Sequence, residues 1–461
     1  MKNSLFKKII VFSFITLNCA NCLAQCWSKI SCGNSFTIAI KSDGTLWAWG
    51  RNDYFQLGDG TAISKLSPIQ ISSDTNWADV SSNDWHSVAL KNDGTLWSWG
   101  YNQYGVLGNG TNIGISEPTQ IGTDSDWNKV STGINHTIAI KQNGTLWAWG
   151  YNYSGALGDG TNVNKLTPIQ VGTDTDWNKI SAGSHSLAIK LNGTLWAWGY
   201  NMDGNLGDGT TINRFYPIQI GTNNNWSQID CNFHSIGLKS DGTLWAWGPN
   251  NYGELGDGSI ILYRSVPTQI GLNNWSNITV GGSYTIAKKV DGTLWSWGNN
   301  NIGQLGDGTT INKNIPTNVS IDNDWQSFTA GADCSFSTKN NGSTWVWGNN
   351  YFGSFGNGTE FNNSQNPNIV MNCSQLNINY YDMQKNSIFA YPNPTQNFIN
   401  INSKNEKIIN ISLSDIMGRE IISKKVNTFQ ELLDIYNLIP ATYILNVYTN
   451  SNMKNIKIIK N

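Results

Sequence analysis

The chain has 461 residues, which is enough for more than one domain and a large buried core. Only 13% of its residues are charged and the formal net charge is −2, so the composition excludes a basic nucleic-acid surface and a polybasic membrane patch. Asn, Ser, Thr and Gly supply the polarity instead, which favours an extracellular β-protein over a cytosolic enzyme.

The first residues have the pattern of a secretory signal. Basic residues flank an apolar run over residues 9–17, which is too short to span a membrane. Small residues follow, with Ala24 directly before Gln25. We predict a signal peptide over residues 1–24 and a mature chain without a membrane span, which is secreted or held on the outer cell surface.

A phrase close to Gly-Thr-Leu-Trp-Ala-Trp-Gly then occurs seven times, at intervals of 49 or 50 residues. A period of that length indicates one supersecondary unit repeated in space. The unit that starts at Pro68 has strand signals at residues 68–71, 77–81, 86–91 and 95–100. Asp-Gly between the last two is typical of a two-residue hairpin. Four-stranded sheets repeated seven times predict an all-β fold, a seven-bladed β-propeller.

The order of the strand signals predicts how the ring closes. The repeats begin at Trp27, in a second strand, and end at residues 367–370, in a first strand. We therefore expect a composite 3+1 blade, with three strands from the N-terminal end and one from the C-terminal end. This closure would bring Cys26 toward Cys373, so we predict a disulfide between them, worth roughly 5 kcal/mol on the chain-entropy model.

Tryptophans and histidines recur at fixed repeat positions. Of the 22 tryptophans, 21 occupy three such positions and only Trp85 falls outside them. This regularity favours packing between blades over a stacking surface for sugars or bases. The histidines share a position that Phe, Tyr or Cys fills in other copies, so we expect packing, no metal site and no cofactor. These histidines are His86, His136, His185 and His234.

The repeat resembles that of the regulator of chromosome condensation family. One copy shows the full pattern with Gly133, His136, Asn143-Gly144, Trp149-Gly150-Tyr151-Asn152, Gly155-Ala-Leu-Gly158 and Pro168. The resemblance covers about residues 26–373 and implies a seven-bladed propeller, to which we assign residues 25–373. It does not settle the function, because members of the family act as nucleotide-exchange factors, photoreceptors, enzyme inhibitors and binding platforms.

A second resemblance covers roughly residues 388–461. Tyr391-Pro392-Asn393-Pro394 and the later Leu413-Ser-Asp-Ile-Met-Gly-Arg-Glu are similar to the type A sorting domain of the type IX secretion system. This implies a small C-terminal β-sandwich that interacts with the type IX secretion machinery. An ordinary accessory β-domain is the alternative. Residues 374–387 lack the repeat and are interpreted as a linker.

Five of the seven repeats pair an acid in the turn Leu-Gly-Asp-Gly-Thr with a base in the next loop. Copies two and seven lack both residues. The matched loss favours local salt bridges, each worth about 0–1 kcal/mol if exposed, over a ring of cations for an anionic ligand. The pairs are Asp59 with Lys65, Asp159 with Lys165, Asp208 with Arg214, Asp257 with Arg264 and Asp307 with Lys313.

A binding site should lie where the repeats differ from one another. The residue after Trp-Gly is arginine in the first copy and tyrosine in the next three, which could form an aromatic strip for a protein or a glycan. Surface decoration is the alternative. The loop over residues 260–266 is one residue longer than its counterparts. The candidate binding residues are Arg51, Tyr101, Tyr151, Tyr200, Tyr263 and Arg264.

Catalytic motifs are missing from the sequence. The propeller has three glutamates, each in a different repeat, and no nucleophile elbow, phosphate loop or metal-binding helix motif. We therefore expect an exported binding module without catalytic residues, whose ligand is an unidentified protein or glycan and not nucleic acid. The alternatives are a glycan-binding lectin, an inhibitor of another protein and, less favoured, a carbohydrate-active enzyme.

Overall fold

The computed structural model describes residues 27–272, 274–371, 388–391, 395, 397–403, 406–416, 418–450 and 453–460. Its regular elements are β-strands, apart from the short 3-10 helix η1 (Tyr351–Gly353). The signal peptide, Cys26, Cys373 and the linker lie outside the described residues, so cleavage and the disulfide stay predictions.

Within these residues, 28 strands form seven antiparallel four-stranded sheets in chain order. The first four sheets are β1 (Trp27–Cys32), β2 (Phe36–Lys41), β3 (Leu46–Gly50), β4 (Lys65–Ser72); β5 (Trp77–Asn83), β6 (His86–Lys91), β7 (Leu96–Gly100), β8 (Ile115–Gln120); β9 (Trp127–Thr132), β10 (His136–Lys141), β11 (Leu146–Gly150), β12 (Lys165–Gln170); and β13 (Trp177–Ala182), β14 (His185–Lys190), β15 (Leu195–Gly199), β16 (Arg214–Gln219). The other three are β17 (Trp226–Cys231), β18 (Ser235–Lys239), β19 (Leu244–Pro249), β20 (Tyr263–Ile270); β21 (Trp275–Val280), β22 (Tyr284–Lys289), β23 (Leu294–Gly298), β24 (Lys313–Asn318); and β25 (Trp325–Ala330), β26 (Cys334–Lys339), β27 (Thr344–Gly348), β28 (Ser364–Met371).

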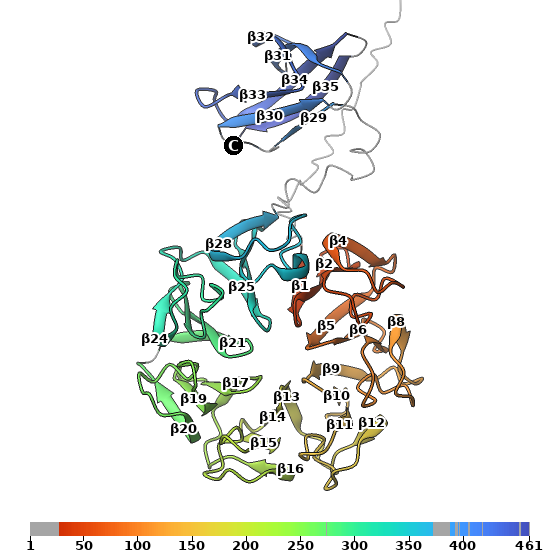
Figure 1. Cartoon of the computed structure of the whole chain (residues 1–461), viewed down its shortest axis with the longest axis vertical. Coiled ribbons are helices and arrows are strands. Elements are labelled where there is room, and N and C mark those ends of the chain that lie inside the picture. The colour runs from red at the N-terminus through yellow and green to blue at the C-terminus, as the bar shows by residue number, and fades with distance from the viewer. Residues whose placement is uncertain are drawn as a thin grey trace, which may run out of the picture.

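The strands lie where the repeat predicts them. β6 is buried along its whole length, as an apolar strand covered on both faces should be. The hairpin to β7 turns at Gly94, whose φ of +79° suits glycine, and Asp93 Oδ1 accepts the backbone N–H of Thr95 at 3.0 Å. The seven sheets stand round a common centre, with the first strand of each nearest to it (Figure 1). The prediction of an all-β seven-bladed propeller is confirmed.

The predicted composite 3+1 blade is wrong. The proline strand β4 pairs with β3 of its own sheet, with Trp47 opposite Gln70 and Gly50 opposite Lys65. The loop after Gly50 folds back on itself, so β4 returns beside the strand that precedes it instead of opening the next sheet. Each blade is therefore built from consecutive strands, and β28 completes the seventh sheet beside β27.

The ring closes by the same contact that joins neighbouring sheets elsewhere. Trp99 Nε1 donates to the carbonyl oxygen of Gln56 in the preceding sheet at 2.9 Å. Trp49 Nε1 makes the equivalent bond to Ser354 at 2.9 Å, although 305 residues separate the two in the chain. The seventh sheet therefore packs on the first, as Figure 1 shows for the blue and red ends of the propeller.

The recurring tryptophans fill the spaces between the sheets. The second tryptophan of each Trp-x-Trp is fully buried in all seven copies, and the one that opens each first strand is almost so. Trp77 and Trp99 of the second sheet pack in one cluster with Phe36, Ile38 and Ile40 of the first. The prediction that these rings pack between blades is confirmed.

The C-terminal part is a small β-sandwich, as predicted. One sheet has the order β29–β30–β33 and the other the order β32–β31–β34–β35. A single apolar core, which includes Ile401, Leu413 and Leu445, lies between them. The strands are β29 (Ile388–Tyr391), β30 (Phe398–Ser403), β31 (Ile408–Asp415), β32 (Glu420–Thr428), β33 (Gln430–Asp434), β34 (Ala441–Thr449) and β35 (Met453–Lys460).

Candidate functional site

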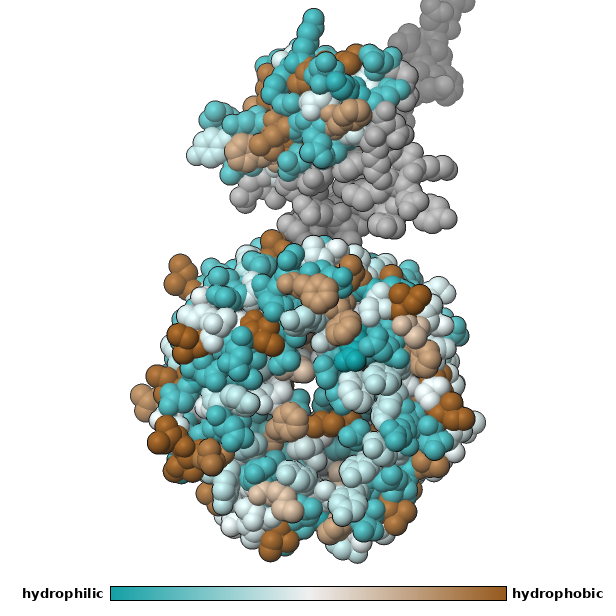
Figure 2. Space-filling view, in the orientation of Figure 1, coloured by the Kyte–Doolittle hydropathy of each residue, from teal (hydrophilic) through white to brown (hydrophobic). Residues whose placement is uncertain are grey.

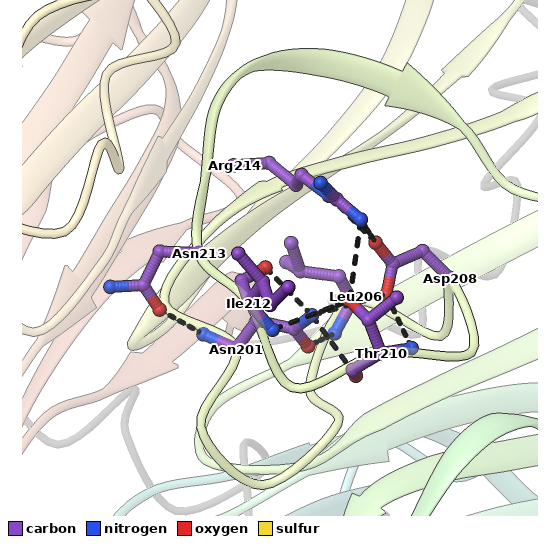
Figure 3. Close-up of polar contacts among 7 residues, drawn as sticks. All are labelled: Asn201, Leu206, Asp208, Thr210, Ile212, Asn213 and Arg214. Carbon is purple, nitrogen blue, oxygen red and sulfur yellow. Dashed lines mark hydrogen bonds and ion pairs between the residues drawn. The ribbon is translucent and has the colours of Figure 1, made fainter.

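A buried asparagine holds the loop between the third and fourth strands of each sheet. In the fourth sheet, Asn201 Oδ1 accepts the backbone N–H of Leu206 at 2.9 Å, and Nδ2 donates to Asp208 Oδ1 at 3.1 Å. Nδ2 also donates to the carbonyl oxygens of Thr210 and Ile212 (Figure 3). One buried side chain therefore fixes the path of the whole loop. The equivalent residues are Asn52, Asn102, Asn152, Asn250, Asn300 and Asn350.

The predicted acid–base pairs lie in these loops. Arg214 Nη2 is 2.5 Å from Asp208 Oδ2, beside Asn201 (Figure 3). Burial would raise the pKa of Asp208, but hydrogen bonds from Thr210, Arg214 and Asn201 outweigh it, and the pKa is lowered. The other cations each lie within 3.3 Å of their own carboxylate, which leaves no ring of unpaired cations among these five. Their pairs are Asp59 with Lys65, Asp159 with Lys165, Asp257 with Arg264 and Asp307 with Lys313.

Aromatic rings from these loops, with Trp85 from the loop between β5 and β6, form a continuous strip on the propeller. Tyr104 lies between two predicted tyrosines, with its ring centroid 6.4 Å from that of Tyr101 and 4.9 Å from that of Tyr151. Trp85 lies 5.5 Å from Tyr101 and stacks on Tyr54 at 4.9 Å. We call these rings, with Tyr153 stacked 6.4 Å from Tyr151, the aromatic strip: Tyr54, Trp85, Tyr101, Tyr104, Tyr151 and Tyr153.

The strip continues into a pocket of about 360 Å³, which we call the aromatic pocket. Tyr151 belongs to both the strip and the pocket, and Tyr200, Phe233 and Pro249 supply further apolar walls. Loops of the third to sixth sheets line the pocket, so it lies across several blades. The polar side chains among its lining residues include Asn135, Ser184, Asp203, Asn251 and Glu254.

Of the two carboxylates that line the pocket, one supports its own loop. Burial raises the pKa of Glu254, and its Oε2 accepts the backbone N–H of Tyr252 at 2.6 Å. Gln56 and Gln304 accept the equivalent backbone N–H in other blades, so this position stabilises the loop whether it holds an acid or an amide. This geometry differs from that of a catalytic acid, which must face the substrate.

The other candidate residues have separate positions. Arg51 lies at the Tyr54 end of the strip, 5.9 Å from that ring, and its Nε is 2.8 Å from Asp53 Oδ2. Tyr263 is exposed on β20 and is not among the residues that line the pocket, and Arg264 is held by its own carboxylate. The structure therefore brings Arg51, Tyr101, Tyr151 and Tyr200 to one surface, and leaves Tyr263 and Arg264 apart from it.

The four histidines are buried, and each joins its sheet to the next. His86 Nε2 is 3.1 Å from Thr137 Oγ1, and His185 Nε2 is 2.6 Å from Ser235 Oγ. His136 and His234 make the same link to the following sheet. Burial lowers the pKa of His136 to about 4 and that of the other three to about 3. Among the described residues, no group of three or more His, Cys, Asp or Glu could hold a metal ion.

A polar channel runs through the centre of the ring and has a volume of about 140 Å³ (Figure 2). Residues near the end of the first strand of each sheet line it, and they include Ser31, Ser81, Ser131, Ser181, Asp230, Thr279 and Thr329. Ser31 Oγ accepts the backbone N–H of Ser82 at 2.9 Å, and the same link recurs between later sheets. Asp230 accepts hydrogen bonds from Ser181 and Thr279, so its carboxylate ties its neighbours together.

Sequence reasoning missed five aromatic rings of this surface, which are Tyr54, Trp85, Tyr104, Tyr153 and Phe233. Trp85 is the tryptophan outside the regular repeat positions, which was the available signal. Tyr54, Tyr104 and Tyr252 share one repeat position, two residues after the buried asparagine, where other copies have Ser, Asp, Ile or Phe. This position therefore varies like the one after Trp-Gly. Phe233 gave no comparable signal.

Family models match most of the described chain. The regulator of chromosome condensation (RCC1) repeat matches residues 43–90, 93–140, 143–189, 192–236, 241–287 and 291–337, and a second model of that repeat matches residues 27–56, 77–106 and 127–156. A model described as a secretion system C-terminal sorting domain matches residues 389–461. This domain indicates secretion or attachment at the cell surface through the type IX system. None of the residues described forms a helix long and apolar enough to cross a membrane.

Similar proteins share the repeat or the fold. The E3 ubiquitin-protein ligase HERC2 of Homo sapiens is 40% identical over 40 residues, which is 9% of this chain and 1% of the ligase. The mitochondrial RCC1 domain-containing protein RUG3 of Arabidopsis thaliana is 37% identical over 46 residues, or 10% of either chain. The chain thus spans a small part of these relatives.

Two solved propellers match over much greater lengths. Prp20p from Saccharomyces cerevisiae has a TM-score of 0.65 at 22% identity, over 73% of this chain and 88% of its own. Human WBSCR16 has a TM-score of 0.60 at 24% identity, over 66% of this chain and 85% of its own. At these identities the likeness shows the fold.

Proposed function

We propose that this chain, which belongs to the regulator of chromosome condensation repeat family and ends in a secretion system sorting domain, is an exported propeller that binds its ligand through the aromatic strip and pocket. We assign residues 1–24 to a cleaved signal peptide, 25–373 to the propeller, 374–387 to a linker and 388–461 to the sorting domain. In this arrangement the C-terminal domain serves export and the propeller serves binding.

The observation that carries the proposal is the continuity of the strip and the pocket. Tyr153 and Phe233 are 70% and 46% exposed, although aromatic rings elsewhere in the propeller are mostly buried between sheets. Aromatic side chains are favoured at sites that are partly exposed to solvent and partly in contact with a partner. A concave site with apolar walls and a few polar groups is also the usual form of a ligand pocket.

The proposal is tested with the purified full chain as bait for extracellular material of the producing organism. We compare the wild type with a Trp85→Ala, Tyr151→Ala double variant, which changes both the strip and the pocket. Tyr216→Ala is the matched control, because Tyr216 is exposed on β16 and is not among the residues that line the pocket. Capture should fall in the double variant and stay in the control, and equal capture by all three proteins refutes the proposal.

A second surface favours a protein partner, as in the inhibitor alternative. In the longer loop of the fifth sheet, Ile260 is 92% exposed and Leu262 is 66% exposed, and Ile261 and Tyr263 are exposed beside them. A contiguous exposed apolar group of this kind marks a protein contact. If this loop carries the binding, an Ile260→Asp, Leu262→Asp variant loses capture while the double variant of the strip keeps it.

We propose no catalytic activity. Glu254 is committed to its own loop, and the equivalent amides show that the loop does not require an acid. A hydrolase assay on the oligosaccharides named below, with the wild type and Glu254→Gln, checks this proposal. Turnover that is lost in Glu254→Gln would refute it and establish the carbohydrate-active enzyme alternative.

A further inference from the structure

We infer that the ligand of the aromatic strip and pocket is a neutral, unbranched oligosaccharide, with its chain along the strip and one end in the pocket. This inference rests on the proposed function and names the chemical class of the ligand. It depends on the shape of the site, the charges around it and the kinds of side chain in it.

The shape of the site suits an extended chain of flat units. Tyr54, Trp85, Tyr101, Tyr104 and Tyr151 follow one another with ring centroids between 4.9 and 6.4 Å apart. Three of these four ring contacts are tilted or edge to face, so the rings do not form one flat platform. A pyranose ring has an apolar C–H face that can lie on single ring faces along the row. The pocket of about 360 Å³ at the end of this row would hold the terminal units.

Several charges around the site are paired or weakened. The guanidinium of Arg51 is 2.8 Å from the carboxylate of Asp53. Burial raises the pKa of Asp84, whose carboxylate accepts a hydrogen bond from Asn34 Nδ2 at 3.0 Å, and burial also raises the pKa of Glu254. Strong recognition of a phosphate chain needs unpaired cations, and recognition of a basic peptide needs exposed carboxylates. An uncharged ligand fits this surface better.

The side chains also favour a sugar over a protein partner. Asn135, Ser184 and Asn251 line the pocket and can each donate and accept hydrogen bonds, as sugar hydroxyls do. The core of a protein interface is usually apolar, and the exposed aliphatic residues of the propeller lie mainly round its outer rim (Figure 2). The exposed aliphatic residues include Ile63, Ile113, Val163, Ile212, Ile261 and Ile311.

The hydroxyl groups of Tyr101, Tyr151 and Tyr200 stay protonated, and that of Tyr101 donates to Gln103 Oε1. Burial raises the pKa of Tyr101, with a further contribution from Tyr104, and burial likewise raises the pKa of Tyr151. Burial and the Asp203 carboxylate raise the pKa of Tyr200. Binding of a neutral sugar should therefore change little between pH 6 and pH 8, because these tyrosine hydroxyls do not titrate in that range.

The test measures binding of the full chain to linear hexasaccharides of glucose, mannose and xylose, with oligogalacturonate as the anionic probe. We expect binding to at least one neutral probe and none to oligogalacturonate. Tyr151→Ala should weaken binding about tenfold or more, because one stacking ring and one pocket wall are lost, whereas Tyr216→Ala should leave it unchanged. Thermal unfolding of each variant shows whether it is folded.

The outcomes separate this inference from the proposed function. If no neutral probe binds, or Tyr151→Ala binds as the wild type does, the inference is overturned. If the probes fail but the double variant of the strip still loses a captured protein, the strip binds a protein and the proposed function stands. If neither probe nor captured material depends on the strip, both fail.

Discussion

The four buried histidines should make the propeller sensitive to mild acid. Burial lowers the pKa of each to about 3 or about 4, whereas an unfolded histidine has a pKa of about 6.5. Between pH 7 and pH 5 the unfolded chain therefore binds protons that the folded chain does not bind. The free energy of unfolding falls as the pH falls, and integration over this window gives a loss of about 2 kcal/mol for each histidine.

One substitution isolates this contribution. Phe36 occupies the position of His86 in the first sheet, so His86→Phe places a residue that the fold already accepts there. Thr137, the partner of His86, keeps its bond to the carbonyl oxygen of Val106. We expect the loss of stability between pH 7 and pH 5 to shrink by about 2 kcal/mol in this variant, whatever its stability at pH 7.

Urea unfolding followed by tryptophan fluorescence measures this loss. All 22 tryptophans lie between residues 27 and 347, so the signal reports the propeller alone. Tyr284→Phe is the matched control, because Tyr284 has the same repeat position and its raised pKa keeps it from titrating in this window. Asp230 and Glu254, with raised pKa values, act in the opposite direction, but they are common to all three proteins. An unchanged pH dependence in His86→Phe would refute the reasoning.

Two further predictions concern the buried asparagine of the loops and the packing between neighbouring sheets. Asn201→Ala should lower the free energy of unfolding by about 3 kcal/mol, because it leaves buried hydrogen-bond partners unsatisfied. Arg214→Met should lower it by at most about 1 kcal/mol. Equal losses for the two variants in urea titrations would contradict the role of the asparagine. Gly158→Ala should cost about 1–3 kcal/mol more than Gly122→Ala, although both glycines have positive φ. A Cβ at Gly158 would lie 2.9 Å from Trp198, whereas a Cβ at Gly122 would have nothing within 4 Å. Equal midpoints of urea unfolding for the two variants would show that the contact between Gly158 and Trp198 is loosely packed.

The sequence predicted the strands and the packing because both follow from local periodicity. The positions of β6 and β7 come from an apolar run and an Asp-Gly turn, which need no knowledge of distant residues. The assignment of strands to blades was predicted wrongly, because strand signals do not say with which neighbour a strand pairs. That choice is made by the loop after Gly50, whose buried Asn52 folds the chain back onto the same sheet.

Contacts between side chains on different strands could not be predicted either, because the sequence does not say which strands become neighbours. Lys91 Nζ lies 4.0 Å from the ring of Trp97 and 2.7 Å from Asp74, which combines a cation–π contact and an ion pair at one amine. The strip could be predicted only in part, from the tyrosines after Trp-Gly. Trp85 joins it from the loop between β5 and β6, so the two kinds of loop meet only in the folded ring.

The repeat itself explains why the loop residues of the aromatic strip should be the ones that bind the ligand. In nearly every blade the second tryptophan and the buried asparagine make the same bonds, so substitution there would weaken the ring. The side chains of the residue after Trp-Gly and of the one two places beyond the asparagine make no such bond in common, although backbone hydrogen bonds hold the chain around them. Tyr101 and Tyr104 occupy these two positions in one loop, so rings placed there gain a rigid support without altering it. A propeller of this kind can change its ligand by changing those residues alone, which is why the function must be sought in the differences between the copies.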